Sequence, residues 1–214
     1  KYDFLSQHQY DSLKSLPIKL NYQSEDFKFG IATYFREVLR KEMLDWCKEH
    51  TNNSTGKPYN LYTDGLRIYT TIDSRMQRYA EEAVAEHLRD LQGMFDKELK
   101  NKRNAPFAWN VNKTEIANMM KQGMKRSERY RVLKKAGLSE EQIEKNFNTK
   151  IQMSVFSWKG PIDTVMSPLD SVRYYKGYLQ TGFMSMEPQT GYIKAWVGGI
   201  NHKFFQYDHV QIGH

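Results

Sequence analysis

The sequence is poor in cysteine and in long apolar runs. Its single cysteine, Cys47, can form no internal disulfide and no zinc site built on several thiolates. Cys47 falls on the apolar side of a predicted helix, which favours a small buried side chain over a reactive thiol. The mean hydropathy of −0.77 and the short apolar runs predict no membrane-spanning helix. The first residues also lack the pattern of a signal peptide, so any targeting segment is expected upstream or removed.

Catalytic and metal-binding motifs are equally scarce. The six histidines are scattered and no carboxylates cluster with them, which predicts no metal site. The Gly198-Gly199 pair lacks the later glycine and the Lys-Ser/Thr of a phosphate-binding loop. One literal Ser-x-x-Lys occurs, Ser54 to Lys57, but Gly56 and Pro58 would break the helix that a serine nucleophile of this type needs. We therefore expect no catalytic, cofactor-binding or metal-binding residue, and no cofactor.

Positive charge is in excess: 32 Lys and Arg face 25 Asp and Glu, a net charge of +7. Seven of the cations belong to one predicted helix, residues 114–136: Lys121, Lys125, Arg126, Arg129, Arg131, Lys134 and Lys135. Such a face could attract nucleic acid, an anionic membrane surface or an anionic glycan, or it could be solvated surface. Nucleic acid is disfavoured because Tyr130 is the helix's only aromatic residue, which leaves little for base stacking.

Apolar periodicity and turn signals predict an α+β protein: a small antiparallel sheet with hairpins packed by several amphipathic helices. Helical spacing covers residues 6–16 (ended by Pro17), 31–49, 74–91, 114–136, 140–147 and 168–177. An extended stretch is expected after Pro17, followed by a connector to Phe29. Strands are expected at 59–63 and 66–71 around Asp64-Gly65, at 151–158, and at 179–186 and 192–197.

Several helix ends carry their own signals. Asp73 or Ser74 is expected to cap the helix that follows, with Gln77 completing a capping box. The buried stripe of that helix is predicted to be Met76, Ala80, Ala83, Val84, His87 and Leu91. Ser139 with Gln142 forms a second predicted capping box, and Gly137 ends the helix before it. Ser167 with Pro168 starts the helix at 168.

The hairpin at 179–197 has the most distinctive sequence. Its strands are joined by residues 187–191, in which Pro188 and Gly191 suit a tight loop, and Gly198-Gly199 then permits a close approach of backbone. An acidic residue, Pro, Thr-Gly, alternating Ile193, Ala195 and Val197, and a Gly-Gly pair are similar to the opening hairpin of the transpeptidase domain of penicillin-binding proteins. Residues 65–73, with Gln77 and residues 80–84, resemble a second motif of the same family in the same order. These motifs cover about a quarter of the chain.

The resemblance implies a fragment of a bifunctional (class A) penicillin-binding protein, with an incomplete transpeptidase-type fold and a largely helical insertion. Residues 1–60 would be the end of the glycosyltransferase domain with connecting helices, and residues 61–92 a linker strand-helix unit. Residues 93–150 match no motif of the family and look like an insertion. Residues 151–214 would begin the transpeptidase domain. None of the family's catalytic residues can be mapped, and the acylating serine is expected beyond His214.

The function implied is that of a non-catalytic linker or scaffold in a peptidoglycan glycosyltransferase and penicillin-sensitive DD-transpeptidase. The longer protein would be anchored on the periplasmic side of the bacterial inner membrane, while the fragment is soluble. Partners would be peptidoglycan strands and other cell-wall synthesis proteins, not nucleic acid. Self-association is expected through an exposed sheet edge in the 179–197 hairpin or the residues after it. The alternative is a stand-alone basic module that binds anionic glycan or nucleic acid.

Overall fold

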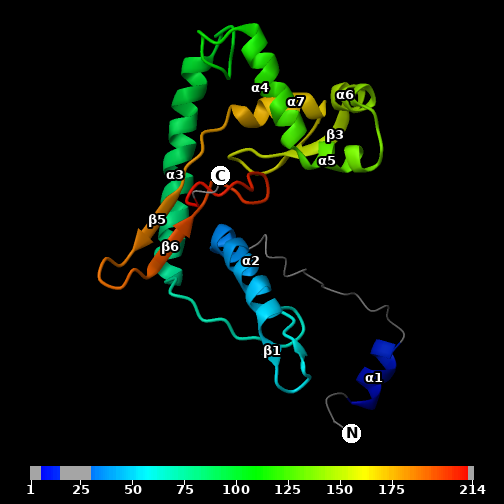
Figure 1. Ribbon diagram of the computed structural model, residues 1–214, viewed down its shortest axis with the longest axis vertical. Helices are drawn as coiled ribbons and strands as arrows, with labels where there is room; N and C mark the ends of the chain where they lie inside the picture. The colour runs from blue at the N-terminus through cyan, green and yellow to red at the C-terminus, as the bar shows by residue number, and fades with distance from the viewer. Residues whose placement is uncertain (1–5, 15–29, 212–214) are drawn as a thin grey trace.

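The computed structural model describes residues 6–14 and 30–211 (Figure 1). The helices are α1 (Gln7–Lys14), α2 (Thr33–Glu49), α3 (Ser74–Leu99), α4 (Lys113–Arg126), α5 (Glu128–Lys135), α6 (Glu140–Asn148) and α7 (Pro168–Lys176). The strands are β1 (Thr51–Asn52), β2 (Lys57–Pro58), β3 (Ile151–Val155), β4 (Ile162–Met166), β5 (Phe183–Met186) and β6 (Ile193–Val197). They form three two-stranded antiparallel sheets in the order β1-β2, β3-β4 and β5-β6, so the fold is α+β.

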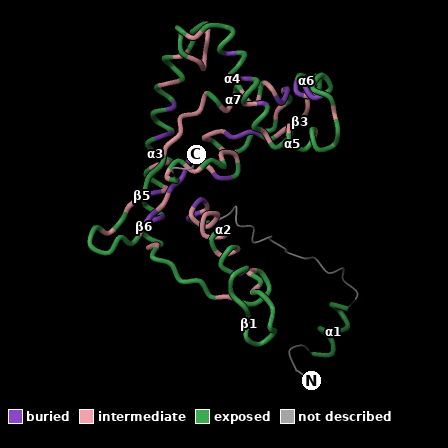
Figure 2. Tube along the Cα trace, viewed as in Figure 1, coloured by how far each residue is buried: buried purple, intermediate pink, exposed green. Residues whose placement is uncertain are grey.

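Helix α3 is the long axis of this arrangement. It spans 26 residues and connects the β5-β6 hairpin at its beginning with the group of helices α4 to α7 beyond its end (Figure 1). The chain returns from α7 beside α3 to reach β5 (Figure 1). Burial is confined to narrow strips where these segments meet, and much of α3 faces solvent (Figure 2). The molecule therefore has two small cores joined by one helix.

The first core lies between α3 and β6. Ala80 of α3 packs against Ala195 and Val197 of β6, with Val84 half-buried beside them. Small side chains on the helix allow the strand to approach closely, and Ala195 and Val197 are the alternate residues of β6 that face it. The inward face of β6 is the one that alternation in the sequence predicts.

The second core lies within α4 to α7. Met124, Ile143 and Phe147 are buried there, surrounded by half-buried residues of α5, α7 and the α5–α6 turn. Helices α4 and α7 approach closely at Gly123, where an added Cβ would stand 2.7 Å from a methyl carbon of Val172. The helices are short, so packing and capping rather than length hold them in place.

An aromatic cluster joins the helical group to the residues after β6. The ring of Phe156 lies 5.2 Å from that of Tyr178 and 5.3 Å from that of Phe205, both edge-on. Phe205 in turn packs edge-on against Tyr175 of α7 at 5.3 Å. Edge-to-face rings at these separations attract one another beyond the burial of their surface. The cluster ties the polypeptide after Gly199 back to the helices.

Several predicted features are confirmed. The capping box of Ser139 and Gln142 is present, and the Ser167 cap has a reciprocal partner in Asp170. Gly137, with a φ of 84°, ends α5, and the amide of Leu138 donates to the carbonyl of Leu133 in the geometry of a Schellman motif. Helix α2, strand β3 and the β5-β6 hairpin lie where the sequence places them, although the strands are shorter. Pro17 and the connector to Phe29 lie outside the described residues.

The predicted hairpin around Asp64-Gly65 is wrong. Residues 59–71 contain no strand, and the nearest strand pairing is that of β1 with β2, which precedes them. Gly65 does take a positive φ of 66°. However, the Asp64 carboxylate accepts from the Asn60 amide at 3.0 Å, and the Asn60 side chain accepts from the Tyr62 amide at 2.9 Å. These local side-chain bonds satisfy the backbone in a compact turn, so no strand pairing is needed.

Residues 66–71 therefore do not share a sheet with β6, contrary to the prediction of a common sheet. The two segments nevertheless touch. The hydroxyl of Thr71 donates to the carbonyl of Ile193 at 2.8 Å, and the amide of Asp73 donates to the carbonyl of Lys194 at 3.0 Å. The contact between the two family-like motifs is real, and it is made at the start of α3.

The single helix predicted for residues 114–136 is two helices. Ser127 has an extended ψ of 149°, ending α4 and capping α5. Its hydroxyl donates to the carbonyl of Met124 at 2.6 Å and accepts from the amide of Tyr130 at 3.2 Å. Serine competes with helical backbone bonds in this way, which accounts for the break.

The predicted inner face of α3 is displaced by about one residue. Met76, Ala83, His87 and Leu91 are exposed, whereas Gln77, Leu88 and Gln92 are buried. Asp73 alone caps the helix, accepting from the amides of Arg75 and Met76. Gln77 is therefore not part of a capping box. The sequence method failed here because it assigns glutamine to the solvent side.

The glycine pair after β6 generates a stability prediction. A Cβ at Gly199 would lie 2.4 Å from the Tyr34 hydroxyl oxygen, whereas a Cβ at Gly93 in α3 would meet nothing within 4 Å. We expect Gly199→Ala to lower the free energy of unfolding by about 1–3 kcal/mol, because Tyr34 is buried and must shift. Gly93→Ala should raise it by up to about 1 kcal/mol. Urea unfolding measures both, and equal effects of the two variants would contradict this packing.

Candidate functional site

The most constrained part of the molecule is the point where α2, α3, β6 and the residues after β6 meet at Trp196. We call Phe35, Gln77, Trp196 and Asp208 the Trp196 junction. The indole Nε1 donates to a carboxylate oxygen of Asp208 at 2.9 Å, and the ring lies 6.1 Å from that of Phe35 in α2. The Trp196 side chain thus contacts both α2 and the segment that follows β6.

Gln77 of α3 binds the backbone of Trp196. Its Nε2 donates to the Trp196 carbonyl at 2.8 Å and its Oε1 accepts from the Trp196 amide at 2.7 Å. The side chain is completely buried, and both ends of its amide are used. A primary amide in this position satisfies a strand in the way a neighbouring strand would.

The rest of the outer edge of β6 is closed as well. Beyond Trp196, the Gly198 carbonyl accepts from the amide of His209 at 2.7 Å. Before it, the carbonyl of Lys194 accepts from the amide of Asp73. The start of α3 and the segment at 208–209 therefore take the place of a third strand, so the open edge of the hairpin is that of β5.

Helix α2 is fixed to this assembly at two places. Glu81 of α3 accepts from the amide of Ala32, just before α2, at 2.7 Å and from Gln77 Nε2 at 2.8 Å. Tyr34 lies over Gly198 and Gly199, and its hydroxyl donates to the carbonyl of Phe205 at 2.6 Å. Burial raises the pKa of Tyr34 above its ordinary value, so the hydroxyl remains a donor.

A second glutamine of α3 holds the returning chain. Gln92 Nε2 donates to the carbonyl of Gly177 at 2.9 Å, and its Oε1 accepts from the amide of Leu179 at 2.9 Å. Gln92 is buried, like Gln77. The same side-chain chemistry therefore docks the segment after α7 onto the far half of α3.

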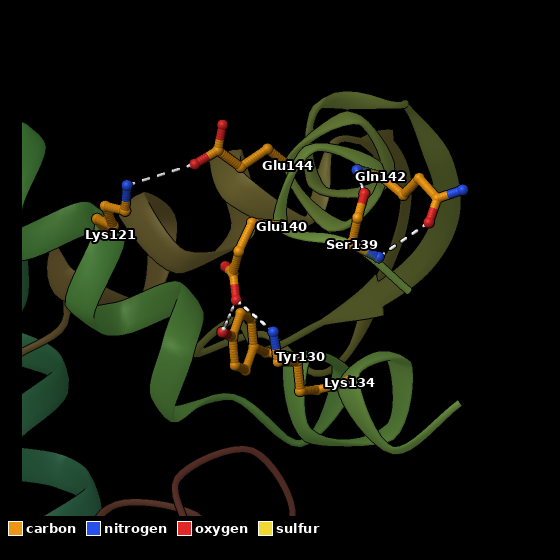
Figure 3. A network of polar contacts seen from close by, with 7 residues as sticks. All are labelled: Lys121, Tyr130, Lys134, Ser139, Glu140, Gln142 and Glu144. Atoms are coloured by element: carbon orange, nitrogen blue, oxygen red, sulfur yellow. Dashed lines mark hydrogen bonds and ion pairs between the residues drawn. The ribbon is translucent and has the colours of Figure 1, made fainter. Parts of the chain in front are cut away.

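The predicted basic face is divided between α4 and α5, and part of its charge is compensated. Lys121 lies 3.5 Å from Glu144 and Lys134 lies 2.7 Å from Glu140 (Figure 3). Arg131 pairs with Glu128. Glu140 also accepts from the Tyr130 hydroxyl at 2.8 Å. Lys134, and then Tyr130, hold the pKa of Glu140 below its usual value. Lys125, Arg126, Arg129 and Lys135 are exposed around these pairs.

The residues that the sequence analysis set aside occupy unremarkable positions. Ser54 lies in the turn between β1 and β2, and Lys57 is the first residue of β2, so neither is in a helix. Cys47 is buried in α2, as predicted. His87 is exposed, and His214 lies outside the described residues. Within residues 6–14 and 30–211, no three His, Cys, Asp or Glu side chains are grouped as a metal ion would need. None of the helices described there has the length and apolar character of a membrane span.

Sequence reasoning missed Gln77, Gln92 and Asp208. One signal was available: Gln77 and Gln92 lie on the side of α3 that also presents Ala80, Val84 and Leu88. A polar residue that continues an apolar stripe indicates a buried partner. Nothing local to Asp208 identifies its bond to Trp196, which depends on the tertiary fold.

Comparison with known proteins identifies the class. The family of the penicillin-binding protein middle domain matches residues 102–179, from the turn after α3 to the segment held by Gln92. The match includes much of the stretch at 93–150 that the sequence motifs had left unassigned. Residues 102–179 thus match the model of the penicillin-binding protein middle domain, and the resemblance of this chain to class A penicillin-binding proteins is confirmed.

The curated relatives are penicillin-binding proteins 1A. Those of Escherichia coli (strain K12) and Haemophilus influenzae are each 32% identical over 87 residues, which is 41% of this chain and 9% of theirs. That of Rickettsia bellii is 34% identical over 74 residues, 35% of this chain and 8% of the relative. The chain thus matches less than a tenth of the length of these proteins. No solved structure matches it.

The Trp196 junction generates a second prediction. Gln77→Leu keeps the bulk of the side chain but leaves the Trp196 amide and carbonyl without partners. We expect a loss of about 2 kcal/mol or more in the free energy of unfolding. Arg78→Leu, at the neighbouring exposed position, is the matched control and should change it by less than about 0.5 kcal/mol.

Urea denaturation followed by circular dichroism measures both variants. Hydrogen exchange should also show faster exchange of the Trp196 amide in Gln77→Leu. A Gln77→Leu variant as stable as the Arg78→Leu variant would mean that the amide does not hold the strand.

Proposed function

We propose that this chain is the non-catalytic linker and scaffold portion of a peptidoglycan synthase. In this role it sets the position of a transpeptidase domain relative to a preceding glycosyltransferase domain. The observation that carries the proposal is the Trp196 junction, where α3 is hydrogen-bonded to the hairpin that resembles the opening of the transpeptidase domain and Phe35 of α2 packs against it. The matched middle domain and the penicillin-binding protein 1A relatives support the same assignment.

The division of labour within the chain follows from the proposal. Residues 1–60 end the glycosyltransferase domain and connect it, and residues 61–92 form the linker with the first part of α3. Residues 93–150 are a helical insertion, of which residues 102–150 fall within the matched middle domain, and residues 151–214 begin the transpeptidase domain. The longer protein lies on the periplasmic side of the bacterial inner membrane, held by an anchor that precedes this chain. Its partners are peptidoglycan strands and other cell-wall synthesis proteins.

A basic binding module is the second candidate. The exposed cations of α4 and α5 favour it, because several lie close together outside any ion pair in the described residues. Binding of anionic glycan would show as retention on a glycan column that salt abolishes. Binding of random duplex DNA with a steep salt dependence would favour nucleic acid instead.

The scaffold proposal predicts an effect on a distant active site. In the full-length protein, Gln77→Leu should lower the rate of acylation by a fluorescent penicillin by about tenfold, because a displaced hairpin misplaces the serine that follows it. Arg78→Leu is the control and should leave the rate unchanged. The 214-residue chain alone should take up no label.

The measurement is made below the unfolding temperature of each full-length variant, so that loss of fold is not read as loss of alignment. An acylation rate of folded Gln77→Leu equal to that of Arg78→Leu would remove the scaffold role of the junction.

The open edge of β5 predicts self-association of this chain. Phe183, Met184 and Met186 are each at least 44% exposed on this short strand, and its outer edge has no neighbouring strand in the described residues. We expect dimers at high concentration, measured by light scattering after size exclusion. Met184→Lys should shift the population to monomer, whereas Met94→Lys, at a methionine of α3 that is even more exposed, should not. A strictly monomeric chain at high concentration would contradict this.

A further inference from the structure

The corner between α4 and α5 encloses a concave basic surface. A hollow of about 440 Å³ lies there, and most of its lining residues are cations: Lys125, Arg126, Arg131, Lys134 and Lys135. We call these five residues the basic hollow. It exists because Ser127 breaks the helix, so that the end of α4 and part of α5 present their side chains to a common space. An uninterrupted helix would have spread the same charges around its circumference.

The corner is held firmly. Ser127 is bonded to the backbone on both sides of the break, at Met124 and Tyr130. Met124 is buried in the second core, and the Schellman motif at Gly137 fixes the other end of α5. Cations on a fixed backbone lose less conformational entropy when they bind a ligand together than cations on a mobile loop.

Local carboxylates neutralise only part of this charge. Glu128 pairs with Arg131. Glu140 pairs with Lys134 at 2.7 Å and also accepts a hydrogen bond from the Tyr130 hydroxyl (Figure 3). Five cations against these two carboxylates leave a surplus of three positive charges. Lys125, Arg126 and Lys135 take part in no ion pair within the described residues. The uncompensated charge is therefore concentrated among the residues that line one concavity.

We propose that the basic hollow binds a compact anion with two adjacent phosphoryl groups, of which inorganic diphosphate is the simplest. Linked phosphoryl groups carry several negative charges and acceptor oxygens in a small volume, which matches three uncompensated cations around a concavity. Arg126 and Arg131 supply forked donors suited to phosphoryl oxygens, and the lysines supply point charges. The proposal is independent of the scaffold role argued above.

Other anions fit less well. A single carboxylate would leave most of the surplus charge uncompensated. A flat membrane surface would not enter the hollow. A nucleic acid strand needs a longer basic track and aromatic rings for its bases, whereas Tyr130 here has its hydroxyl committed to Glu140.

The test is titration of the 214-residue chain with inorganic diphosphate, inorganic phosphate and acetate at constant ionic strength, followed by nuclear magnetic resonance. Diphosphate should bind at least about tenfold more tightly than phosphate, with the largest shifts at residues 125–135. The double variant Lys125→Gln/Arg126→Gln should lose about tenfold or more in diphosphate affinity. The matched control, Arg78→Gln/Arg89→Gln, removes two exposed arginines of α3 and should retain it.

The proposal is overturned if diphosphate binds no better than acetate, or if both double variants lose affinity equally. It is also overturned if a DNA duplex binds at the same residues more tightly than diphosphate. Thermal unfolding by circular dichroism checks that the variants remain folded. If Lys125→Gln/Arg126→Gln does not fold, the single variant Lys135→Gln replaces it. We expect that variant to lose its preference for diphosphate over phosphate.

Discussion

Two buried glutamine amides of α3 hold the other segments in place. Gln77 binds the peptide of Trp196, and Gln92 binds the backbone between Gly177 and Leu179, each by donating one hydrogen bond and accepting one. A buried amide is costly unless both of its ends are paired, so each glutamine accepts one register of its partner and rejects a slip by a single residue. An apolar side chain at the same place would gain burial without imposing that register. The apolar cores beside these amides are small, so the hydrogen bonds mainly determine how the bound segments are placed on α3.

The spacing of the two glutamines along α3 sets the distance between the two units that they bind. They are separated by 15 positions, about 22 Å along a helix that rises 1.5 Å per residue. The hairpin is bound at one end of this length and the chain leaving the helical group at the other. Because a helix is stiff over a few turns, the separation of the two units is set by the number of residues between Gln77 and Gln92. A loop of the same length would leave that separation undefined.

Local chemistry explains which features the sequence could predict. The Ser139 and Ser167 caps and the Gly137 helix end depend on residues within a few positions of one another, and all three are as expected. The β5-β6 hairpin was equally readable from alternation and its Pro-Gly loop. The wrong predictions have local causes too. Asp64 and Asn60 close a turn with their own side chains, so the strand pair that the sequence predicted there does not form. Ser127 interrupts a continuous apolar period, so periodicity predicted one helix where there are two.

The candidate site was beyond such reasoning because its bonds join residues far apart in the chain. Gln77 lies 119 residues from Trp196, and Tyr34 lies 171 residues from the carbonyl that it binds. The Gly198-Gly199 pair could be recognised as a place of close approach, but not as the seat of Tyr34. Those same glycines belong to the motif that suggested the family, and a side chain at either would meet Tyr34 or Asp208 within 3 Å. The motif is thus also a packing requirement: the hairpin can accept α2 only if its last strand ends without side chains, which links the identity of the hairpin to the position of the helix that precedes it.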